Sequence, residues 1–232
     1  YAGPADTLWR LSGTELFDLT GPVEIGADIG GRLVDPVIRG SLRSRGARLE
    51  SAVTGTVIDQ LTAEARFTGP RLVFSRLAGT TPGGGAIEGS GNVDFSGGNA
   101  ALNLDFTARN ALLLNRDDIA ARVTGPLRVR STGSGGTISG DLRLENGRFT
   151  LGRASAAAAG PQLDVRHGGL DEVEVIQSAE LRPWRLDLSL AGGDLRARGL
   201  GIDSLWATDL RIGGPAESPP FTGRPAPVRR EY

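Results

Sequence analysis

Apolar and polar residues alternate along much of the chain with a period of two, which is the pattern of a β-strand that buries one face. The alternation is clearest at residues 102–107 (LNLDFT) and 185–190 (RLDLSL). Shorter runs occur at 127–130 (LRVR), 142–144 (LRL) and 173–175 (VEV). No 11-residue window has the 3.6-residue period of an amphipathic helix. The pattern therefore predicts an all-β protein.

Glycine-rich turn signals separate these runs, at 30–31, 83–85, 97–99, 135–136 and 192–194. The Asn146-Gly147 pair lies between Leu142/Leu144 and Phe149 and predicts a tight hairpin. Two segments are less clear. Residues 154–159 are alanine-rich but stop at Gly160-Pro161, which fits a single helical turn or a loop. Residues 111–121 (ALLLNRDDIAA) are compatible with a helix, but a strand fits their neighbours better.

A glycine-containing phrase recurs at 39–42 (RGSL), 90–93 (SGNV) and 139–142 (SGDL), and the three copies are spaced 51 and 49 residues apart. The glycines of these phrases, Gly40, Gly91 and Gly140, are expected to mark strand starts. A unit of about 50 residues would hold about four strands of about 8–11 residues and would bury its apolar face by stacking. Roughly 16 strands would extend over about 75 Å.

A repeating sheet of this kind can form a solenoid, a barrel or an open folded sheet. The short coils of a β-helix and the blade motifs of a propeller are not found. We therefore predict a long, curled, mostly antiparallel repetitive sheet, a β-taco or open trough with an apolar interior. Residues 1–224 are expected to form one elongated domain, and residues 225–232 a Pro/Arg-rich disordered tail.

Composition excludes several functional classes. All 26 basic residues are arginine and 27 residues are acidic, so the net charge of −1 argues against a nucleic-acid partner. The chain has no cysteine, which excludes disulfide scaffolds and thiolate sites. No apolar stretch is long enough for a transmembrane helix. Because 232 residues include no methionine, we expect a fragment of a longer chain.

Candidate catalytic and metal-binding residues each have a simpler interpretation. His167 is the single histidine and stands beside two glycines, as a turn residue does. Asp117 and Asp118 lack a matching set of catalytic or metal-binding groups and fit a solvated turn. Residues 81–85 (TPGGG) lack the Lys-Ser/Thr of a phosphate loop and fit a hairpin loop. We therefore predict no catalytic residue, no metal site and no cofactor.

Four segments carry a family resemblance: 107–129, 138–149, 195–214 and 219–223. Their strand phrases, and above all LRARGLGIDSLWATDLRIGG at 195–214, resemble the carboxy-proximal region of the TamB family of AsmA-like proteins. The resemblance extends over about residues 15–224. It implies a hydrophobic trough in the periplasm of a diderm bacterium, in a full-length protein that is anchored in the inner membrane. It also implies an Omp85-type outer-membrane barrel, TamA, as partner, and roles in phospholipid movement and outer-membrane protein assembly.

An apolar trough would hold phospholipid acyl chains, since each buried CH₂ contributes about 0.8 kcal/mol. The headgroup would stay at the wet seam, and lipid would be guided passively. The residues expected to line such a trough are those of the alternating apolar runs: Leu102, Leu104, Phe106, Leu142, Leu144, Phe149, Val173, Val175, Leu186, Leu188 and Leu190. Trp9, Trp184 and Trp206 would either contact lipid at the groove edge or pack in an ordinary core.

Two other functional classes remain open. A structural or adhesive β-repeat, such as an autotransporter passenger, would have the same alternation with a dry core between facing strands. A carbohydrate-active enzyme on a β-solenoid would need clustered carboxylates, or arginines with aromatics, on one sheet face, and no such cluster is found. The lipid-guiding hypothesis requires an apolar trough that is accessible, whereas the structural or adhesive β-repeat would have a dry core.

Overall fold

A single sheet of fourteen strands contains most of the residues that the computed structural model describes, which are 1–6, 17–32, 35–51, 54–96, 100–133, 135–151, 184–216, 220–223 and 226–227. The all-β, mostly antiparallel prediction is confirmed. The strands are β1 (Ala2–Pro4), β2 (Asp18–Thr20), β3 (Pro22–Arg32), β4 (Asp35–Glu50), β5 (Val57–Thr68), β6 (Arg71–Thr81), β7 (Gly85–Asp94), β8 (Ala101–Asn115), β9 (Ile119–Ser131), β10 (Gly136–Thr150), β11 (Arg185–Gly199), β12 (Ile202–Pro215), β13 (Phe221–Gly223) and β14 (Ala226–Pro227).

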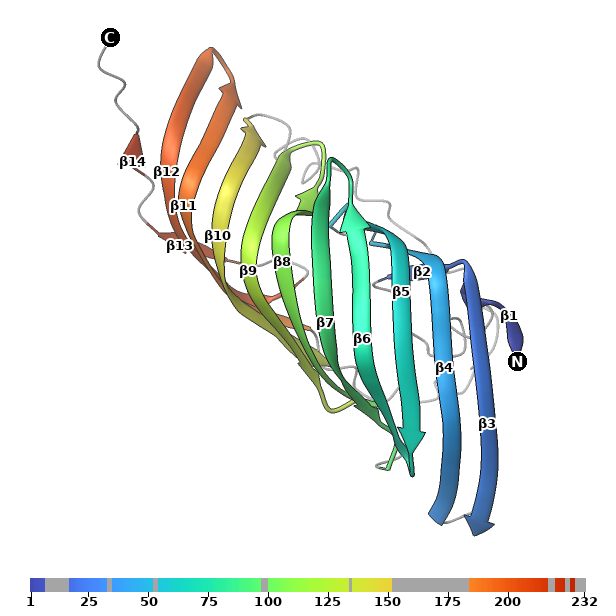
Figure 1. Cartoon of the computed structure of the whole chain (residues 1–232). Coiled ribbons are helices and arrows are strands. Elements are labelled where there is room, and N and C mark those ends of the chain that lie inside the picture. Colours follow the sequence, from blue (N-terminus) through green and yellow to red (C-terminus); the bar gives the residue numbers. More distant parts are fainter. Residues whose placement is uncertain are drawn as a thin grey trace, which may run out of the picture.

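The sheet follows the chain and does not close. Strands β3 to β10 are each antiparallel to the next, as are β11 and β12. Short strands add to the edges: β1 pairs with β3, and β13 and β14 pair with β12. Figure 1 shows strongly bent strands side by side, with the first and last strands at opposite ends of the molecule. This open, curled sheet is the predicted architecture.

One pair departs from the antiparallel pattern. Strands β10 and β11 are parallel, with Leu142 opposite Leu190 and Phe149 opposite Ala197. Parallel neighbours need a crossover connection of a dozen or more residues, because the chain must return to the same end of the sheet. That connection falls at residues 152–183, outside the described residues, as do Val173, Val175 and the alanine-rich segment 154–159.

The 50-residue repeat corresponds to three strands. Gly40 lies in β4, Gly91 in β7 and Gly140 in β10, and the strands from β4 to β10 are 10 to 16 residues long. The expectation of about four shorter strands per unit is therefore wrong. The three glycines also lie inside their strands and do not start them. Of the expected tail, Ala226 and Pro227 pair with β12.

Irregular pairings interrupt the long strands at corresponding levels and change the alternation. On β8 the buried residues are Ala108 and then Ala111, and the register shifts between them. On β10 it shifts between Leu144 and Asn146, and on β11 between Ala191 and Asp194. A β-bulge adds one residue and increases the local twist. Each bulge therefore lets the strand bend while its apolar residues stay on one face.

Two predicted turns are such bulges, and their prediction as turns is wrong. Asn146-Gly147 lies within β10, where a hairpin is prevented because the strand is paired on both sides, with β9 and β11. Residues 192–194 lie within β11. Other predictions are confirmed: residues 82–84 turn between β6 and β7, and residues 111–121 form the end of β8, a turn and the start of β9. Residues 97–99 are not among those described.

The β11 bulge should be the least tolerant position for a side chain. Gly193 has φ +65°, and a Cβ atom there would lie 1.9 Å from the carbonyl oxygen of Leu144 on β10. Gly193→Ala is expected to lower the free energy of unfolding by about 3 kcal/mol, through the strained φ and the clash. Urea denaturation measures this change.

Gly26→Ala is the matched control. Gly26 lies in β3 with nothing within 4 Å of the added Cβ. The alanine should leave stability unchanged or raise it by up to about 1 kcal/mol, because it restricts the unfolded chain. Equal losses in both variants would contradict the bulge interpretation.

Candidate functional site

The cross-strand register gathers the apolar residues of ten strands on one face of the sheet, called here the apolar face. Residues directly opposite one another in neighbouring strands share a face. One row across the sheet consists of Ile25, Leu42, Ala65, Phe74, Gly91, Leu104, Val129, Ile138, Leu186 and Gly214. Parallel rows contain Phe106 with Leu127, Leu188 with Ile212, and Leu142 with Leu190 and Leu210.

Nine of the eleven residues expected to line a trough are described, and all nine lie on this apolar face. Leu104 and Leu186 share a row, and Leu142 is opposite Leu190. The bulge at Leu144/Asn146 brings Phe149 onto the same side as Leu142 and Leu144. Val173 and Val175 lie outside the described residues.

The apolar face also contains residues that were not among the eleven expected to line the trough: Leu127, Val129, Ile138, Leu210 and Ile212. A signal for two of them was present, since Leu127 and Val129 belong to the alternating run at 127–130. Leu210 and Ile212 alternate with Asp209 and Arg211 in the same way.

Burial differs along the apolar face. Leu144 is 1% exposed, and it packs in a cluster with Ile87, Ala108, Ala111 and Val123. Leu142 belongs to the same cluster and is 8% exposed. The other seven described residues of the expected lining are half-buried. One part of the face is thus packed upon itself, with Phe106, Leu188 and Leu190 partly buried against it, whereas the remainder keeps partial contact with solvent. We call the packed part the closed end.

A loop between β4 and β5 holds the closed end together. The Thr56 hydroxyl donates to the carbonyl oxygen of Leu113 at 2.6 Å, and the Asn115 amide donates to the carbonyl oxygen of Thr54 at 2.9 Å. These bonds join the loop to β8 across the β6–β7 hairpin. Thr81, in that hairpin, accepts a bond from the Leu112 amide at 3.0 Å. Polar backbone contacts therefore close this end around the apolar cluster.

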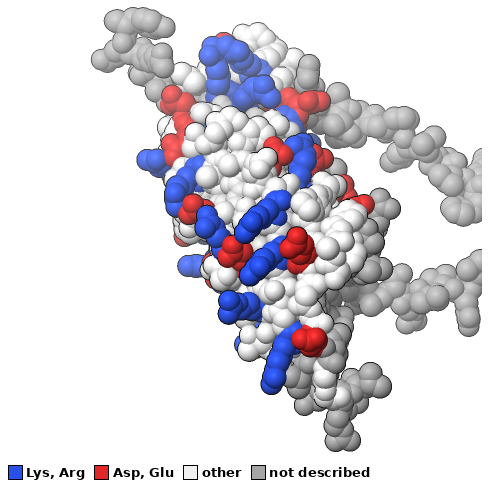
Figure 2. Space-filling view, turned by 45° about the vertical axis from the view of Figure 1, so that its right-hand side comes forward, with Lys and Arg blue, Asp and Glu red and all other residues white. Residues whose placement is uncertain are grey.

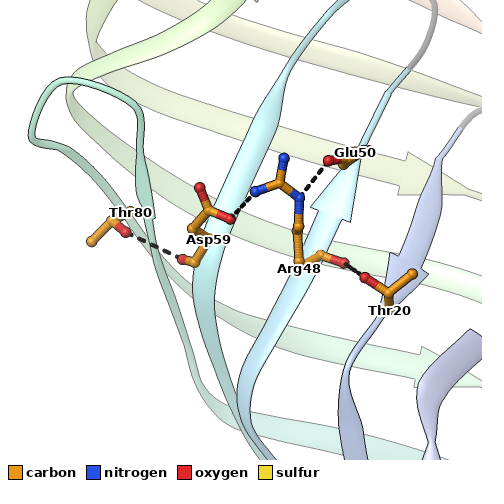
Figure 3. Close-up of polar contacts among 5 residues, drawn as sticks. All are labelled: Thr20, Arg48, Glu50, Asp59 and Thr80. Carbon is orange, nitrogen blue, oxygen red and sulfur yellow. Dashed lines mark hydrogen bonds and ion pairs between the residues drawn. The ribbon is translucent and has the colours of Figure 1, made fainter.

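The opposite face of the sheet carries paired charges and is called here the charged face. Figure 2 shows basic and acidic side chains interspersed over the visible surface. On β4, the Arg48 guanidinium donates hydrogen bonds to Glu50 and to Asp59 of β5. These bonds raise the pKa of Arg48 above its usual value, and the bond to Glu50 contributes most. Figure 3 shows this arrangement, in which Thr20 and Thr80 bond the flanking backbone.

A second pairing joins the last two long strands. Arg196 donates two bonds of 2.8 Å to the carboxylate of Asp203, and Arg198 donates a third at 3.2 Å. The bond from Arg196 is the main cause that lowers the pKa of Asp203 to about 2. The carboxylate therefore stays ionised throughout the neutral range, and the charged face suits contact with water.

The residues singled out in the sequence do not assemble into a catalytic or metal site within the described part of the chain. Asp118 accepts a bond of 3.0 Å from Arg116 in the β8–β9 turn, and Asp117 is exposed there. No group of three or more potential metal ligands occurs among the described residues. No described helix is long and apolar enough to cross a membrane. His167 and Trp9 lie outside the described ranges.

The two described tryptophans are half-buried near the end of the sheet. Trp206 lies opposite Leu195 on the apolar face, and its indole nitrogen donates to the Ser204 hydroxyl at 2.7 Å. Trp184 precedes β11 beside Gly136. Between Trp206 and Leu210, the buried Thr208 hydroxyl has no hydrogen-bond partner among the described residues. The apolar face thus ends in a strand that carries an aromatic ring and a few polar atoms.

Comparison with known proteins adds one match. A family model described as the TamB C-terminal domain matches residues 75–224, about two thirds of the chain. The match begins in β6 and extends past β13, so it includes most of the apolar face. No curated protein and no solved structure matches the chain.

Proposed function

Because this chain belongs to the TamB family of bacterial envelope proteins, which serves membrane assembly and lipid transport, we propose that its apolar face guides phospholipid acyl chains between the inner and outer membranes. The chain would do so as part of a periplasmic scaffold that is anchored in the inner membrane. Its partner at the outer membrane would be an Omp85-type barrel, TamA, and the same scaffold would support outer-membrane protein assembly.

One observation carries this proposal: a single open sheet with a continuous apolar face on one side and paired charges on the other. The apolar rows cross the strands, so they run along the length of the sheet. An acyl chain on this face gains about 0.8 kcal/mol per buried CH₂. Moving it along rows of Leu, Val and Phe exchanges similar contacts, so guidance needs neither a catalytic residue nor a cofactor.

Seven half-buried residues of the expected lining are available to a lipid: Leu102, Leu104, Phe106, Phe149, Leu186, Leu188 and Leu190. Leu142 and Leu144 lie in the packed cluster and would stabilise the sheet without contacting the lipid. The phosphate headgroup would stay at the edge of the apolar face, where water is present. The closed end, held by the β4–β5 loop, would limit how far an acyl chain extends toward that side.

The absence of cysteine in the 232 residues allows single labels to locate a bound lipid. Leu188→Cys places a fluorescent label on the apolar face of β11, and Ala191→Cys places the same label on the exposed, opposite side of the same strand. A phospholipid with a spin label in its acyl chain quenches nearby fluorophores. We expect strong quenching at position 188 and little at position 191.

The two labels separate the possible outcomes. Equal quenching at both positions would indicate adsorption over the whole surface and would contradict the groove. No quenching at either position would indicate a dry interior, as in a structural or adhesive β-repeat. In both cases the proposal would fail while the family membership would stand.

A further inference from the structure

Charges on the charged face are balanced along rows that cross the sheet. One such row alternates in sign, with Arg43 between Glu24 and Glu64, and with Arg128 next to Asp105. A second row pairs Arg39 with Asp28, and Arg71 with Asp94. Opposite charges in directly facing positions stabilise a sheet, and like charges destabilise it.

The row between these two does not follow the rule. It consists of Gly26, Ser41, Arg66, Val73, Asn92, Asn103, Arg130, Thr137, Arg185 and Pro215. The row holds three arginines and no carboxylate. From β7 to β11 each of its side chains is a hydrogen-bond donor: two asparagines, an arginine, a threonine and another arginine. We call residues 92, 103, 130, 137 and 185 the donor row.

The donor row borders a cavity. The cavity measures about 700 Å³, which is within the range of small-molecule sites, and Arg71, Arg130 and Arg185 all line it. Among the described residues of its lining, Asp94 is the single acidic one. The structure therefore brings three guanidinium groups from β6, β9 and β11 to one hollow, in whose described lining arginines outnumber carboxylates.

Asp94 does not neutralise this excess. Its Oδ2 accepts bonds from Arg71 at 2.8 and 3.1 Å, and its Oδ1 accepts from the amide and hydroxyl of Ser96 at 2.9 and 2.6 Å. The bonds from Ser96 are the main cause that lowers the pKa of Asp94 to about 2, so its charge is present and already matched by Arg71. Both carboxylate oxygens are occupied.

The other two arginines differ in how far they are engaged. Arg130 donates from one amino group to the Leu104 and Val129 carbonyl oxygens at 2.6 and 3.1 Å, and from the other to Asp105 at 2.8 Å. These bonds fix its guanidinium at the cavity. The Arg185 side chain is exposed and makes no hydrogen bond or ion pair with the described part of the chain. Its guanidinium is therefore available to a ligand.

We propose that this cavity binds a phosphate group, either of a phosphate ester such as a lipid headgroup or of free phosphate. Arginine forms paired, charge-assisted hydrogen bonds to phosphate oxygens, and the amide and hydroxyl donors of Asn103 and Thr137 complete such a site. The site lies on the charged face and extends to Leu102 and Gly136 at the end of an apolar row. It shares Leu102 with the expected lining of the acyl groove, but phosphate binding does not require the groove.

Binding of glycerol 3-phosphate and of inorganic phosphate to the purified chain, measured by calorimetric titration at low salt, tests the site. We expect saturable binding that weakens as salt is added. Arg185→Gln should weaken it about tenfold, since a charge-assisted bond is lost, and should leave the fold intact because the Arg185 side chain bonds no described group. Arg148→Gln is the charge-matched control, at the far end of β10 from Thr137.

A third ligand identifies the source of the phosphate. Monomeric dihexanoyl-phosphatidylglycerol that binds at least tenfold more tightly than glycerol 3-phosphate would assign the site to a lipid headgroup, and equal affinities would assign it to free phosphate or a small ester. Failure of all three ligands to bind saturably, or equal losses in Arg185→Gln and Arg148→Gln, would overturn the site. Leu188→Arg should lower phospholipid capture and leave glycerol 3-phosphate binding unchanged. The two measurements therefore test the groove and the phosphate site separately.

Discussion

Leu188→Arg is expected to lower phospholipid capture by the chain at least tenfold. Leu188 is half-buried on the apolar face of β11, opposite Gly140 on β10 and Ile212 on β12. A guanidinium group there brings charge and water onto the path of the acyl chain, and placing an unpaired charge against hydrocarbon is costly. Native mass spectrometry measures the co-purifying phospholipid.

Ala191→Arg is the matched control, because it adds the same charge to the same strand. Ala191 is exposed and lies opposite Asp209 on β12, so the new arginine has a carboxylate nearby. We expect lipid capture to match that of the unmodified chain. Circular dichroism of both variants checks that the sheet is retained.

A variant at a second lining position tests whether loss of lipid capture comes only from misfolding. Leu186→Gln introduces a neutral polar group in the row of Leu104 and Ile138, and it should lower capture by less than Leu188→Arg does. If both apolar-face variants retain the sheet and capture lipid as the unmodified chain does, acyl chains do not use this face and the proposed function is wrong.

Leu144→Ala is expected to lower the free energy of unfolding by about 3 kcal/mol, the largest effect of any single truncation on the apolar face. Leu144 is the largest fully buried side chain among the described residues, and it lies opposite Val123 in the cluster of the closed end. Removing its outer carbons leaves a cavity that the bulges of β10 and β11 cannot fill, because the Leu144 carbonyl already lies against Gly193. A lower midpoint of urea denaturation with an unchanged m-value reports this loss.

Leu102→Ala provides the comparison at the more open end. Leu102 is half-buried, opposite Val93 and Ser131, so its truncation removes fewer contacts and should cost about 1 kcal/mol. If Leu102→Ala were as destabilising as Leu144→Ala, the packing would be uniform along the apolar face. A uniformly packed face favours a dry core over a groove.

Several features of the fold could be predicted because they depend on single residues and their immediate neighbours. The alternation at 102–107 and 185–190 requires strands, since only a period of two places Leu102, Leu104 and Leu186, Leu188 on one side each. The turn at 82–84 follows from Pro-Gly-Gly, which supplies the required backbone angles. The open, mostly antiparallel sheet follows from long alternating runs joined by short turns.

The bulges could not be predicted from local chemistry. Asn146-Gly147 has the composition of a hairpin turn, yet β10 continues through it because β9 and β11 both pair with the strand there. Gly192 and Gly193 likewise look like a turn but relieve a close approach to β10. A glycine pair reports only that the backbone needs freedom, and the partners of the strand decide whether that freedom makes a turn or a bulge.

The sequence by itself determined the class of fold, the two unlike faces of the strands and nine described members of the apolar face, because side-chain direction in a strand depends on position along that strand alone. Tertiary structure decided the parallel pairing of β10 and β11, the packed part around Leu144, and the row that contains Arg130 and Arg185 but no carboxylate. These features depend on which residue of a distant strand lies opposite. That register is set jointly by bulges, turns and burial across the whole sheet, so it cannot be read from any one segment.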